Sequence, residues 1–204
     1  VPHVVAVTPL LTSNAQVVYS HNSASVNVEG VYPAELQIGS WSIGSGRWLT
    51  QSDENAAQPL AVLGATTASD LFGDANTAVG KTIFLNGQAF SVVGVLQTKG
   101  SNQDDVVFIP FSTMQARLNN AQYVNAIDAQ ADDAINGTAA ENAITTLLEQ
   151  RHHIQSGQAD DFRINSSNQI ASAVQSNIGT LTLLLVGIAA ISLVVGGIGI
   201  MNIM

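Results

Sequence analysis

The stretch KTIFLNGQAFSVVGVL (Lys81–Leu96) carries the clearest fold signal in the polar part of the chain. Two runs rich in β-branched and aromatic residues flank an Asn-Gly pair. Asn86 and Gly87 both tolerate positive φ, which a two-residue type I′ turn requires. The sequence therefore predicts a β-hairpin that turns at Asn86 and Gly87 and in which Ile83 faces Phe90.

Further strand and helix patterns lie on both sides of this hairpin. Apolar runs bounded by turn residues predict strands at 4–11, 17–20, 25–31, 59–63, 106–110, 123–129 and 160–165. Short helices are expected at 66–72 and 111–118, and residues 39–57 form a Gly/Ser-rich connection that carries both tryptophans. Because strands and helices mix without regular alternation, the pattern predicts an α+β fold.

Two later helices have start signals. Thr138 and Glu141 form a T-x-x-E capping box ahead of an apolar stripe. Ser166 and Gln169 cap a second amphipathic helix, and no proline separates that helix from the apolar run that follows. We therefore expect a nearly continuous helix, with an amphipathic stalk at 166–180 and an apolar segment at 181–204.

The apolar segment LTLLLVGIAAISLVVGGIGIMNIM (Leu181–Met204) contains no charged residue. As a helix it would be about 36 Å long, more than the roughly 30 Å hydrocarbon core of a bilayer. This predicts a membrane span, with burial inside a protein assembly as the alternative. Ala189, Ser192, Gly196 and Gly199 follow helical spacing and form a face of small residues. Such a face favours close helix–helix packing, here between copies of the chain, although glycine is common in membrane helices generally.

Charge excludes several classes of protein. The 204 residues include 15 acidic and 6 basic side chains, for a formal net charge of −9, and no cysteine. Six cations cannot neutralise many phosphates, so a basic nucleic-acid-binding surface is excluded. The absence of cysteine excludes disulfides and thiolate zinc sites. The last charged residue is Arg163, and the lack of cations next to the apolar segment predicts that the residues before it are extracytoplasmic.

Motifs that carry chemistry are missing. VGKT (Val79–Thr82) ends like a phosphate-binding loop but has Ala75 where the first glycine is required. His152 and His153 are adjacent, so a helix would direct them apart, and a solvated helix end explains them better. The paired aspartates lack the pattern of a calcium loop, and no G-x-S-x-G elbow occurs. We identify no catalytic, cofactor-binding or metal-binding residue and expect no enzyme activity in this chain.

Several segments resemble one known family. AAISLVVGGIGIMNIM (189–204) resembles the start of the membrane domain of FtsX-like permeases of the MacB type, which are ABC-transporter subunits for export. Residues 62–96 resemble the central motif of the MacB periplasmic core domain. RWLT (47–50), VFIPFSTMQARL (107–118) and DFRINSSNQI (161–170) fit the same family in order.

The resemblance implies a two-lobed extracytoplasmic domain. A porter-like lobe would be split between 1–57 and 120–165, and a β-rich lobe at 58–119 would be inserted into it. The stalk and apolar helix would then follow. It also implies a bacterial inner-membrane location with residues 1–165 extracytoplasmic, an ATPase domain or subunit, and a periplasmic adaptor as a further partner.

Two functions remain open at this point. The chain is either the extracytoplasmic domain and one membrane helix of an export permease, transmitting conformational change, or a self-assembling structural protein. In the second case an extracellular oligomer or filament would bury the apolar helix in its core. A chain that begins at Val1 and stops after the apolar run is expected to be a processed product or part of a longer protein.

Overall fold

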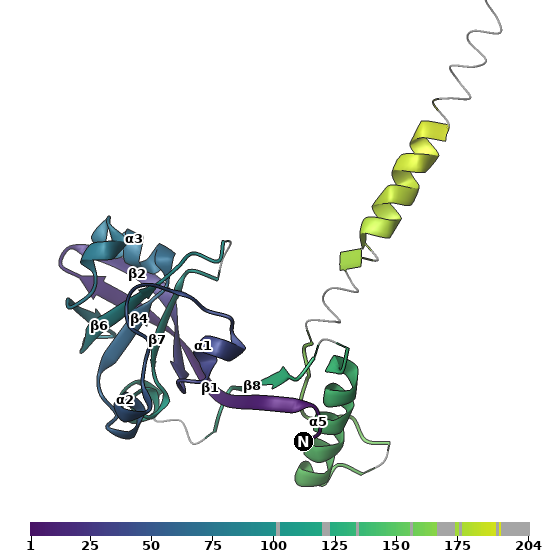
Figure 1. Ribbon diagram of the computed structural model, residues 1–204, viewed down its shortest axis with the longest axis horizontal. Coiled ribbons are helices and arrows are strands. Elements are labelled where there is room, and N and C mark those ends of the chain that lie inside the picture. Colours follow the sequence, from purple (N-terminus) through teal and green to yellow (C-terminus); the bar gives the residue numbers. More distant parts are fainter. Residues whose placement is uncertain are drawn as a thin grey trace, which may run out of the picture. The chain divides into compact units, whose positions relative to one another are not determined.

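The computed structural model describes residues 1–100, 103–119, 123–133, 135–155, 157–166, 174–175, 177–190 and 192. The chain divides into two compact units (Figure 1). Val4–Gln130 forms one, called here the barrel unit, and Val1–His3 with Ala131–Met204 forms the other, the helical unit. The chain passes between them at residues 3–4 and 130–131.

The barrel unit contains most of the regular structure. Its strands are β1 (Val4–Tyr19), β2 (Asn22–Val31), β3 (Ile43–Gly46), β4 (Leu60–Leu63), β5 (Thr82–Leu85), β6 (Gln88–Leu96), β7 (Val106–Pro110) and β8 (Ala126–Ala131), the last ending at the boundary between the units. Its helices are α1 (Glu35–Ile38), α2 (Gln51–Asn55), α3 (Ala65–Phe72) and α4 (Phe111–Thr113), with a 3₁₀ turn η1 (Ala75–Thr77) and a π-helical turn η2 (Met114–Asn119). The helical unit contains α5 (Gly137–His152).

Six strands close into a barrel. β1 pairs with β5, β5 with β6, β6 with β4, β4 with β7, β7 with β2, and β2 returns to β1. The β2–β7 and β4–β6 pairs are parallel and the others are antiparallel. β3 adds to β6, and β8 adds to β1. The pairing therefore confirms a mixed α+β domain in which distant segments of sequence lie side by side.

The predicted hairpin lies in this barrel. Asn86 has φ 47° and Gly87 has φ 83°, which suits the type I′ turn. Ile83 pairs with Phe90 across β5 and β6, and both side chains are fully buried. The local sequence signal and the packing of the core thus specify the same register.

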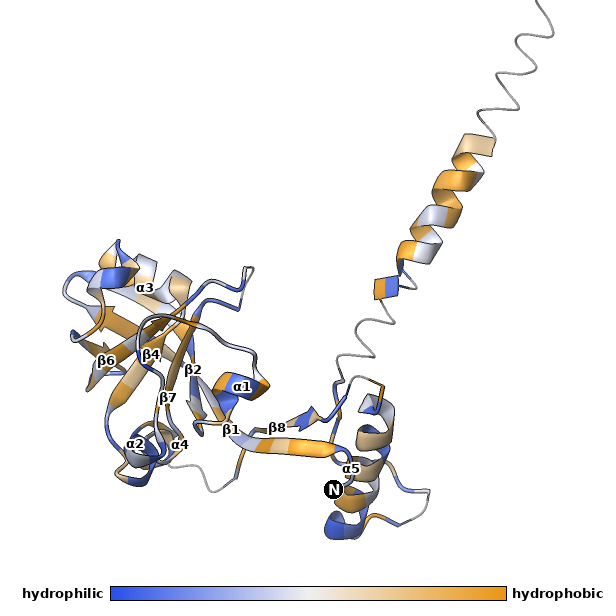
Figure 2. Cartoon of the chain, viewed as in Figure 1, coloured by the Kyte–Doolittle hydropathy of each residue, from blue (hydrophilic) through white to orange (hydrophobic). Residues whose placement is uncertain are grey.

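The core has two parts separated by β7. All five residues of β7 are buried, and their side chains alternate between opposite faces. Val107 and Ile109 join the cluster inside the barrel, where α3 contributes Ala68 and Leu71. Val106 and Phe108 join a second cluster on the outer side. Figure 2 shows the strands of the barrel as largely hydrophobic ribbons.

The segment 39–57, expected to be an open connection, covers that outer face. It contains β3 and α2, and both of its tryptophans pack on Phe108. The ring centroids of Trp41 and Trp48 lie 5.2 and 5.3 Å from that of Phe108. The Trp48 indole also donates a hydrogen bond of 3.0 Å to the carbonyl of Pro33. Burial of aromatic surface therefore orders a segment whose glycine and serine content predicts a loop.

The RWLT segment is ordered by one ion pair. Arg47 donates to both carboxylate oxygens of Asp53 at 2.6 and 3.2 Å. Asp53 also accepts the backbone N–H and hydroxyl of Thr50, while Thr50 accepts the backbone N–H of Asp53, forming a capping box at the start of α2. This arrangement lowers the pKa of Asp53 to about 2, with the Arg47 hydrogen bonds as the main cause.

Strand pairing connects the two lobes that the resemblance implies. β1 and β2 come from the expected porter-like lobe, 1–57 and 120–165, yet they pair with β5 and β7 of the expected inserted lobe, 58–119. Positions 57 and 58 therefore lie within one unit. The reason is that barrel closure requires strands from both segments.

Three local predictions need correction. The strands expected at 4–11 and 17–20 form the single strand β1, because the polar residues between them pair with β2. The strand expected at 160–165 is absent, and those residues have no regular secondary structure. There Asp161 bonds to His152, with 2.7 Å between Oδ1 and Nδ1.

The capping box expected at Thr138 and Glu141 is also wrong in position. α5 begins at Gly137 with Asn136 as its N-cap residue, so Thr138 lies inside the first turn. The Asn136 side chain makes no capping bond and instead donates to Asp132 Oδ1 at 3.0 Å. Of the second expected cap, Ser166 is not helical and Gln169 lies outside the described residues.

The expected C-terminal helix is described in part. Residues 174–175, 177–190 and 192 are helical. The remainder of 167–204 lies outside the described residues. Within the part of the chain that the structure describes, no helix is both long and apolar enough to cross a membrane.

β3 lies so close to β6 that the position of Gly94 has no room for a side chain. A Cβ atom at Gly94 would overlap the backbone carbonyl of Arg47, and the backbone cannot move aside without breaking strand pairing. We expect Gly94→Ala to lower the free energy of unfolding by about 2 kcal/mol, measured by chemical denaturation. Gly44→Ala is the matched control, because its Cβ would lie 3.4 Å from the carbonyl oxygens of Leu96 and Val95. Equal losses in the two variants would contradict this view.

The Arg47–Asp53 pair predicts a defined pH dependence. At pH 7, Asp53→Asn should lower the free energy of unfolding by about 2 kcal/mol, since a charged hydrogen-bonded pair is lost. Because the folded pKa of Asp53 is lowered from 3.8 to about 2, its stabilisation is present above pH 4 and is lost as the pH falls toward 2.

Chemical denaturation of the wild type and of Asp53→Asn at pH 7, 4 and 3 measures the difference between their free energies of unfolding. The gap between the two proteins should narrow at the lowest pH. Asp70→Asn, at an exposed position of α3, is the control and should stay within about 0.5 kcal/mol of the wild type. A gap that is constant from pH 7 to pH 3 would count against the ion pair.

Candidate functional site

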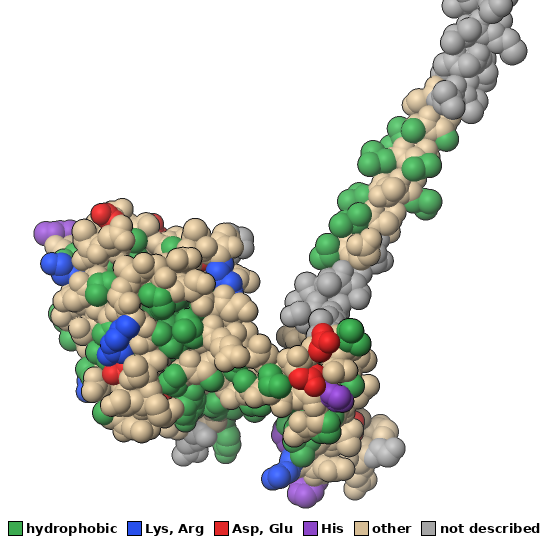
Figure 3. All heavy atoms as spheres, viewed as in Figure 1, with side chains coloured by type: hydrophobic (Ala, Val, Ile, Leu, Met, Phe, Trp, Pro, Cys, Tyr) green, Lys and Arg blue, Asp and Glu red, His purple; other side chains and the backbone are tan. Residues whose placement is uncertain are grey.

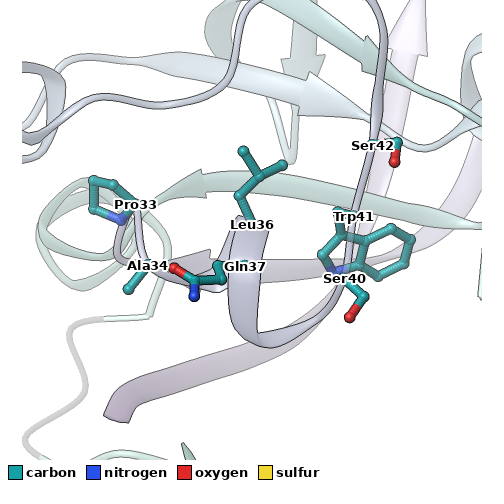
Figure 4. A pocket seen from close by; sticks show the side chains of 7 residues that line it. All are labelled: Pro33, Ala34, Leu36, Gln37, Ser40, Trp41 and Ser42. Atoms are coloured by element: carbon teal, nitrogen blue, oxygen red, sulfur yellow. The ribbon is translucent and has the colours of Figure 1, made fainter. Parts of the chain in front are cut away.

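A shallow hollow lies beside α1. It has a volume of about 580 Å³, and its lining residues all come from one segment: Pro33, Ala34, Leu36, Gln37, Ser40, Trp41 and Ser42 (Figure 4). The same segment covers the outer core cluster through Leu36 and Trp41. The hollow is therefore a surface feature of the loop that the tryptophans hold in place.

Gly39 allows this loop to turn tightly. A Cβ atom there would overlap the indole nitrogen of Trp41 and Oε1 of Glu35. Lys99 closes the turn from the other side, because its Nζ donates to the Gly39 carbonyl at 2.6 Å and lies 4.0 Å from the centroid of the Trp41 ring. The cation thus stabilises the turn through a hydrogen bond and a cation–π contact.

Glu35 is buried behind this turn. Its residue surface is 4% exposed, and its Oε2 has no hydrogen-bond partner among the described residues. Burial, followed by the charges of Asp128 and Glu29, raises the pKa of Glu35 to about 7, while the Trp41 hydrogen bond and Lys99 act in the opposite direction. A buried carboxylate with one unsatisfied oxygen is costly as an anion.

The charges of two further carboxyl groups raise the pKa of Glu35. Glu29 lies in β2, and burial together with the charge of Asp128 raises its pKa to about 7, although Asn27 donates to it at 2.8 Å. Asp128 lies in β8, and burial raises its pKa as well. Glu29, Glu35 and Asp128, called here the acidic cluster, come from β2, α1 and β8.

The beginning of β8 is fastened to β1. The backbone N–H of Asn125 donates to the carbonyl of Leu10 at 3.0 Å, and its side-chain oxygen accepts the backbone N–H of Thr12 at 2.9 Å. All six residues of β8 itself are exposed or half-buried. The strand thus has hydrogen bonds along β1 but little packed apolar surface.

The acidic cluster has no signature in the sequence. Its members lie at positions 29, 35 and 128, in segments that only the barrel brings together. The only sequence signal was a lone glutamate, Glu29, within the strand pattern SVNVEGV. Among the described residues, no group of three or more His, Asp or Glu is arranged to hold a metal ion.

The residues predicted for helix packing are described in part. Ala189 and Ser192 are helical and exposed, whereas Gly196 and Gly199 lie outside the described residues. Figure 3 shows hydrophobic side chains along this helical part of the chain. The large apolar side chains that are exposed among its described residues are Val174, Ile178, Leu181, Leu183, Leu184, Leu185, Val186 and Ile188. Contiguous exposed apolar surface of this kind is typical of sites that contact other proteins or a membrane.

Comparisons with known proteins give a consistent result. The Macrolide export ATP-binding/permease protein MacB of Bdellovibrio bacteriovorus is 36% identical over 203 residues, covering 97% of this chain and 31% of that protein. The protein of the same name from Vibrio parahaemolyticus is 34% identical over 207 residues, covering 100% and 31%. The chain thus spans about a third of the length of these curated relatives.

Solved structures share the fold. The periplasmic region of MacB from Actinobacillus actinomycetemcomitans superposes with a TM-score of 0.72 at 25% identity, covering 86% of this chain and 78% of that one. The extracellular domain of the noncanonic ABC-type transporter YknZ from Gram-positive bacteria, at 18% identity and a TM-score of 0.66, covers 76% and 80% and supports the fold alone. The model of the MacB-like periplasmic core domain family matches residues 1–147, so the chain belongs to this family.

Proposed function

We propose that the chain is the extracytoplasmic domain and one membrane helix of a MacB/FtsX-like ABC export permease, and that it transmits conformational change between the membrane and partner proteins. The observation that carries the proposal is the helical segment after the family domain, whose large apolar side chains from Val174 to Ile188 are exposed. Lipid and neighbouring helices would cover this surface.

The location and partners follow from the same proposal. Residues 1–165 would be extracytoplasmic in a bacterial inner-membrane protein. An ATPase domain or subunit would supply the energy, and a periplasmic adaptor would be a further partner. No catalytic group is assigned to this chain. The curated relatives are named ATP-binding/permease proteins, which favours the permease over a filament-forming protein.

Motion would pass through the segments that join the two units. The chain crosses from the barrel unit to the helical unit at 130–131, directly after β8, and α5 and the C-terminal helical segment follow. Because β8 pairs with β1, whose N-terminal end marks the other crossing, a displacement at either crossing acts on one pair of strands. We propose that this pair is the mechanical connection.

The small-residue face predicts how copies of the helix meet. Ala189 and Ser192 lie on that face, whereas Ala190 is turned about 140° from its centre at 3.6 residues per turn. We expect Ala189→Leu to weaken self-association of the intact permease at least about tenfold, since a larger side chain keeps the helices apart. Ala190→Leu makes the same change on the other side and should leave self-association intact. Sedimentation in detergent measures the self-association of both variants. Equal effects of the two substitutions would contradict packing through the small-residue face.

A disulfide at the same face tests transmission itself. The chain has no cysteine, so Ser192→Cys in an otherwise cysteine-free transporter introduces one thiol per copy. Oxidation should link two copies and reduce ATP turnover of the intact transporter at least about tenfold, with recovery on reduction. Ala190→Cys, placed away from the face, should link poorly and keep its turnover. Full turnover in the linked Ser192→Cys dimer would contradict transmission through this helix.

A further inference from the structure

The turn after α1 lies directly against the carboxyl group of Glu35. Oε1 of Glu35 and the indole nitrogen of Trp41 both lie at the place that a side chain on Gly39 would occupy. Glu35 is 4% exposed. Backbone hydrogen bonds of 2.9, 3.0 and 2.9 Å form the turn, donated by the N–H groups of Gly39, Ser40 and Trp41 to the carbonyls of Glu35, Gln37 and Leu36. The carboxyl group therefore packs on the backbone of the turn itself.

The turn is strained and fixed at its ends. Ser40 has a φ of 52°, in the left-handed region that residues with a side chain seldom adopt. On one side of the turn, the carbonyl of Pro33 accepts the indole N–H of Trp48 at 3.0 Å. On the other, the carbonyl of Ser42 accepts the backbone N–H of Gln97 at 2.8 Å. The residues between Pro33 and Ser42 can therefore move without breaking either attachment.

The buried carboxyl group has little to stabilise a negative charge. Its Oε2 has no hydrogen-bond partner among the described residues. The Trp41 indole and the charge of Lys99 favour the anion, whereas the charges of Asp128 and Glu29 oppose it. β1, which also packs against α1, contains no Asp, Glu, Lys, Arg or His. Since a buried carboxylate without enough donors is costly, the closed turn favours a protonated Glu35.

Water reaches Glu35 most readily through the turn. The other side of this segment is packed, because Leu36 and Trp41 lie on the outer core cluster. The turn itself lies at the surface: Ser40 and Ser42 are exposed and line the hollow beside α1 (Figure 4). Opening the turn would hydrate the carboxylate while the barrel stays closed, as in the local opening of surface segments.

We propose that residues 34–42 form a latch controlled by the proton on Glu35: the turn is closed when Glu35 is neutral and opens when Glu35 is ionised. The hollow beside α1 would then keep its shape only in the protonated form, because the latch provides most of its lining. This inference concerns the barrel unit alone and does not rest on the proposed export function.

The direction of the response follows from the raised pKa of Glu35. Burial, followed by the charges of Asp128 and Glu29, raises this pKa from 4.5 to about 7. A carboxyl group with a raised pKa stabilises the closed form when it is protonated, and this contribution is lost as the pH rises from about 4.5 through about 7. The latch is therefore closed at pH 5.5 and loosened at pH 8.

Hydrogen exchange in the intact chain measures the opening of the latch. After correction for the intrinsic effect of pH, the opening equilibrium of the amides of Gly39, Ser40 and Trp41 should rise at least about fivefold from pH 5.5 to pH 8. Full hydration of Glu35 in the open form would give about thirtyfold, since each pH unit below the folded pKa contributes a factor of ten. A smaller rise than fivefold would overturn the proposal. So would an equal rise in the β5–β6 hairpin, which serves as the internal reference for global unfolding.

Neutral variants identify the group responsible. Glu35→Gln should reduce the rise to less than about twofold and keep the turn protected at pH 8. Glu29→Gln removes a neighbouring charge whose pKa is also raised to about 7, and it should retain a rise of at least about threefold. Glu54→Gln is the matched control, because Glu54 is 5% exposed and has an unpartnered Oε2 but bonds to Ser112 at the start of α4. Its rise should equal that of the wild type.

A folded Glu35→Gln protein that keeps the wild-type response would reject the latch. If Glu35→Gln folds poorly, carbon-13 NMR of the Glu35 carboxyl group in the wild type replaces it. The midpoint of that titration should coincide with the midpoint of turn opening, and midpoints more than about one pH unit apart would equally overturn the proposal.

Discussion

Closure of the barrel between β7 and β2 is the constraint on which the rest of the barrel unit depends. β7 is buried on both faces, so the molecule must fill the inside of the barrel and cover the outside of the same strand. The interior is filled by Phe90, Ile83 and their neighbours. The outside is covered by the second core cluster, in which the segment after α1 folds back and places two tryptophans on Phe108. Since a small barrel has little apolar surface to spare, this cover is part of the fold rather than an addition to it.

The cover also determines where charge is buried. Packing Trp41 on Phe108 fixes the tight turn at Gly39, and the turn encloses Glu35 between the indole and the barrel. Lys99 seals the turn while it compensates part of the charge of Glu35. A hydrophobic requirement on one side of the sheet thus places a carboxyl group in a low-dielectric position. The charges of Glu29 in β2 and Asp128 in β8 then raise the pKa of Glu35 further.

Sequence reasoning succeeds here where the signal is local. The hairpin at Asn86-Gly87, the strand 106–110 and the helix ending before Gly73 depend on turn chemistry and short-range periodicity, and each is found within one or two residues of its expected bounds. Prediction from sequence fails where a contact with a residue distant in the sequence determines the local structure. Ser13 and Asn14 are poor strand formers, yet they pair with Val28 and Asn27 and make β1 continuous. The Gly/Ser-rich segment 39–57 is ordered by Phe108, some sixty positions away. The acidic cluster combines positions 29, 35 and 128, which no spacing rule connects.

Buried apolar packing is concentrated in the closed barrel and is absent from β8, the strand that leads to the helical unit. Elements that must not move, such as β7 and the β5–β6 hairpin, have fully buried side chains. β8, which leads to the crossing at 130–131, has none and is held by hydrogen bonds to β1 at its start. Apolar packing in a close-packed core allows no intermediate positions, whereas the strength of an electrostatic contact varies with protonation. β8, which has no buried side chain, is therefore free of the constraint that core packing places on β7.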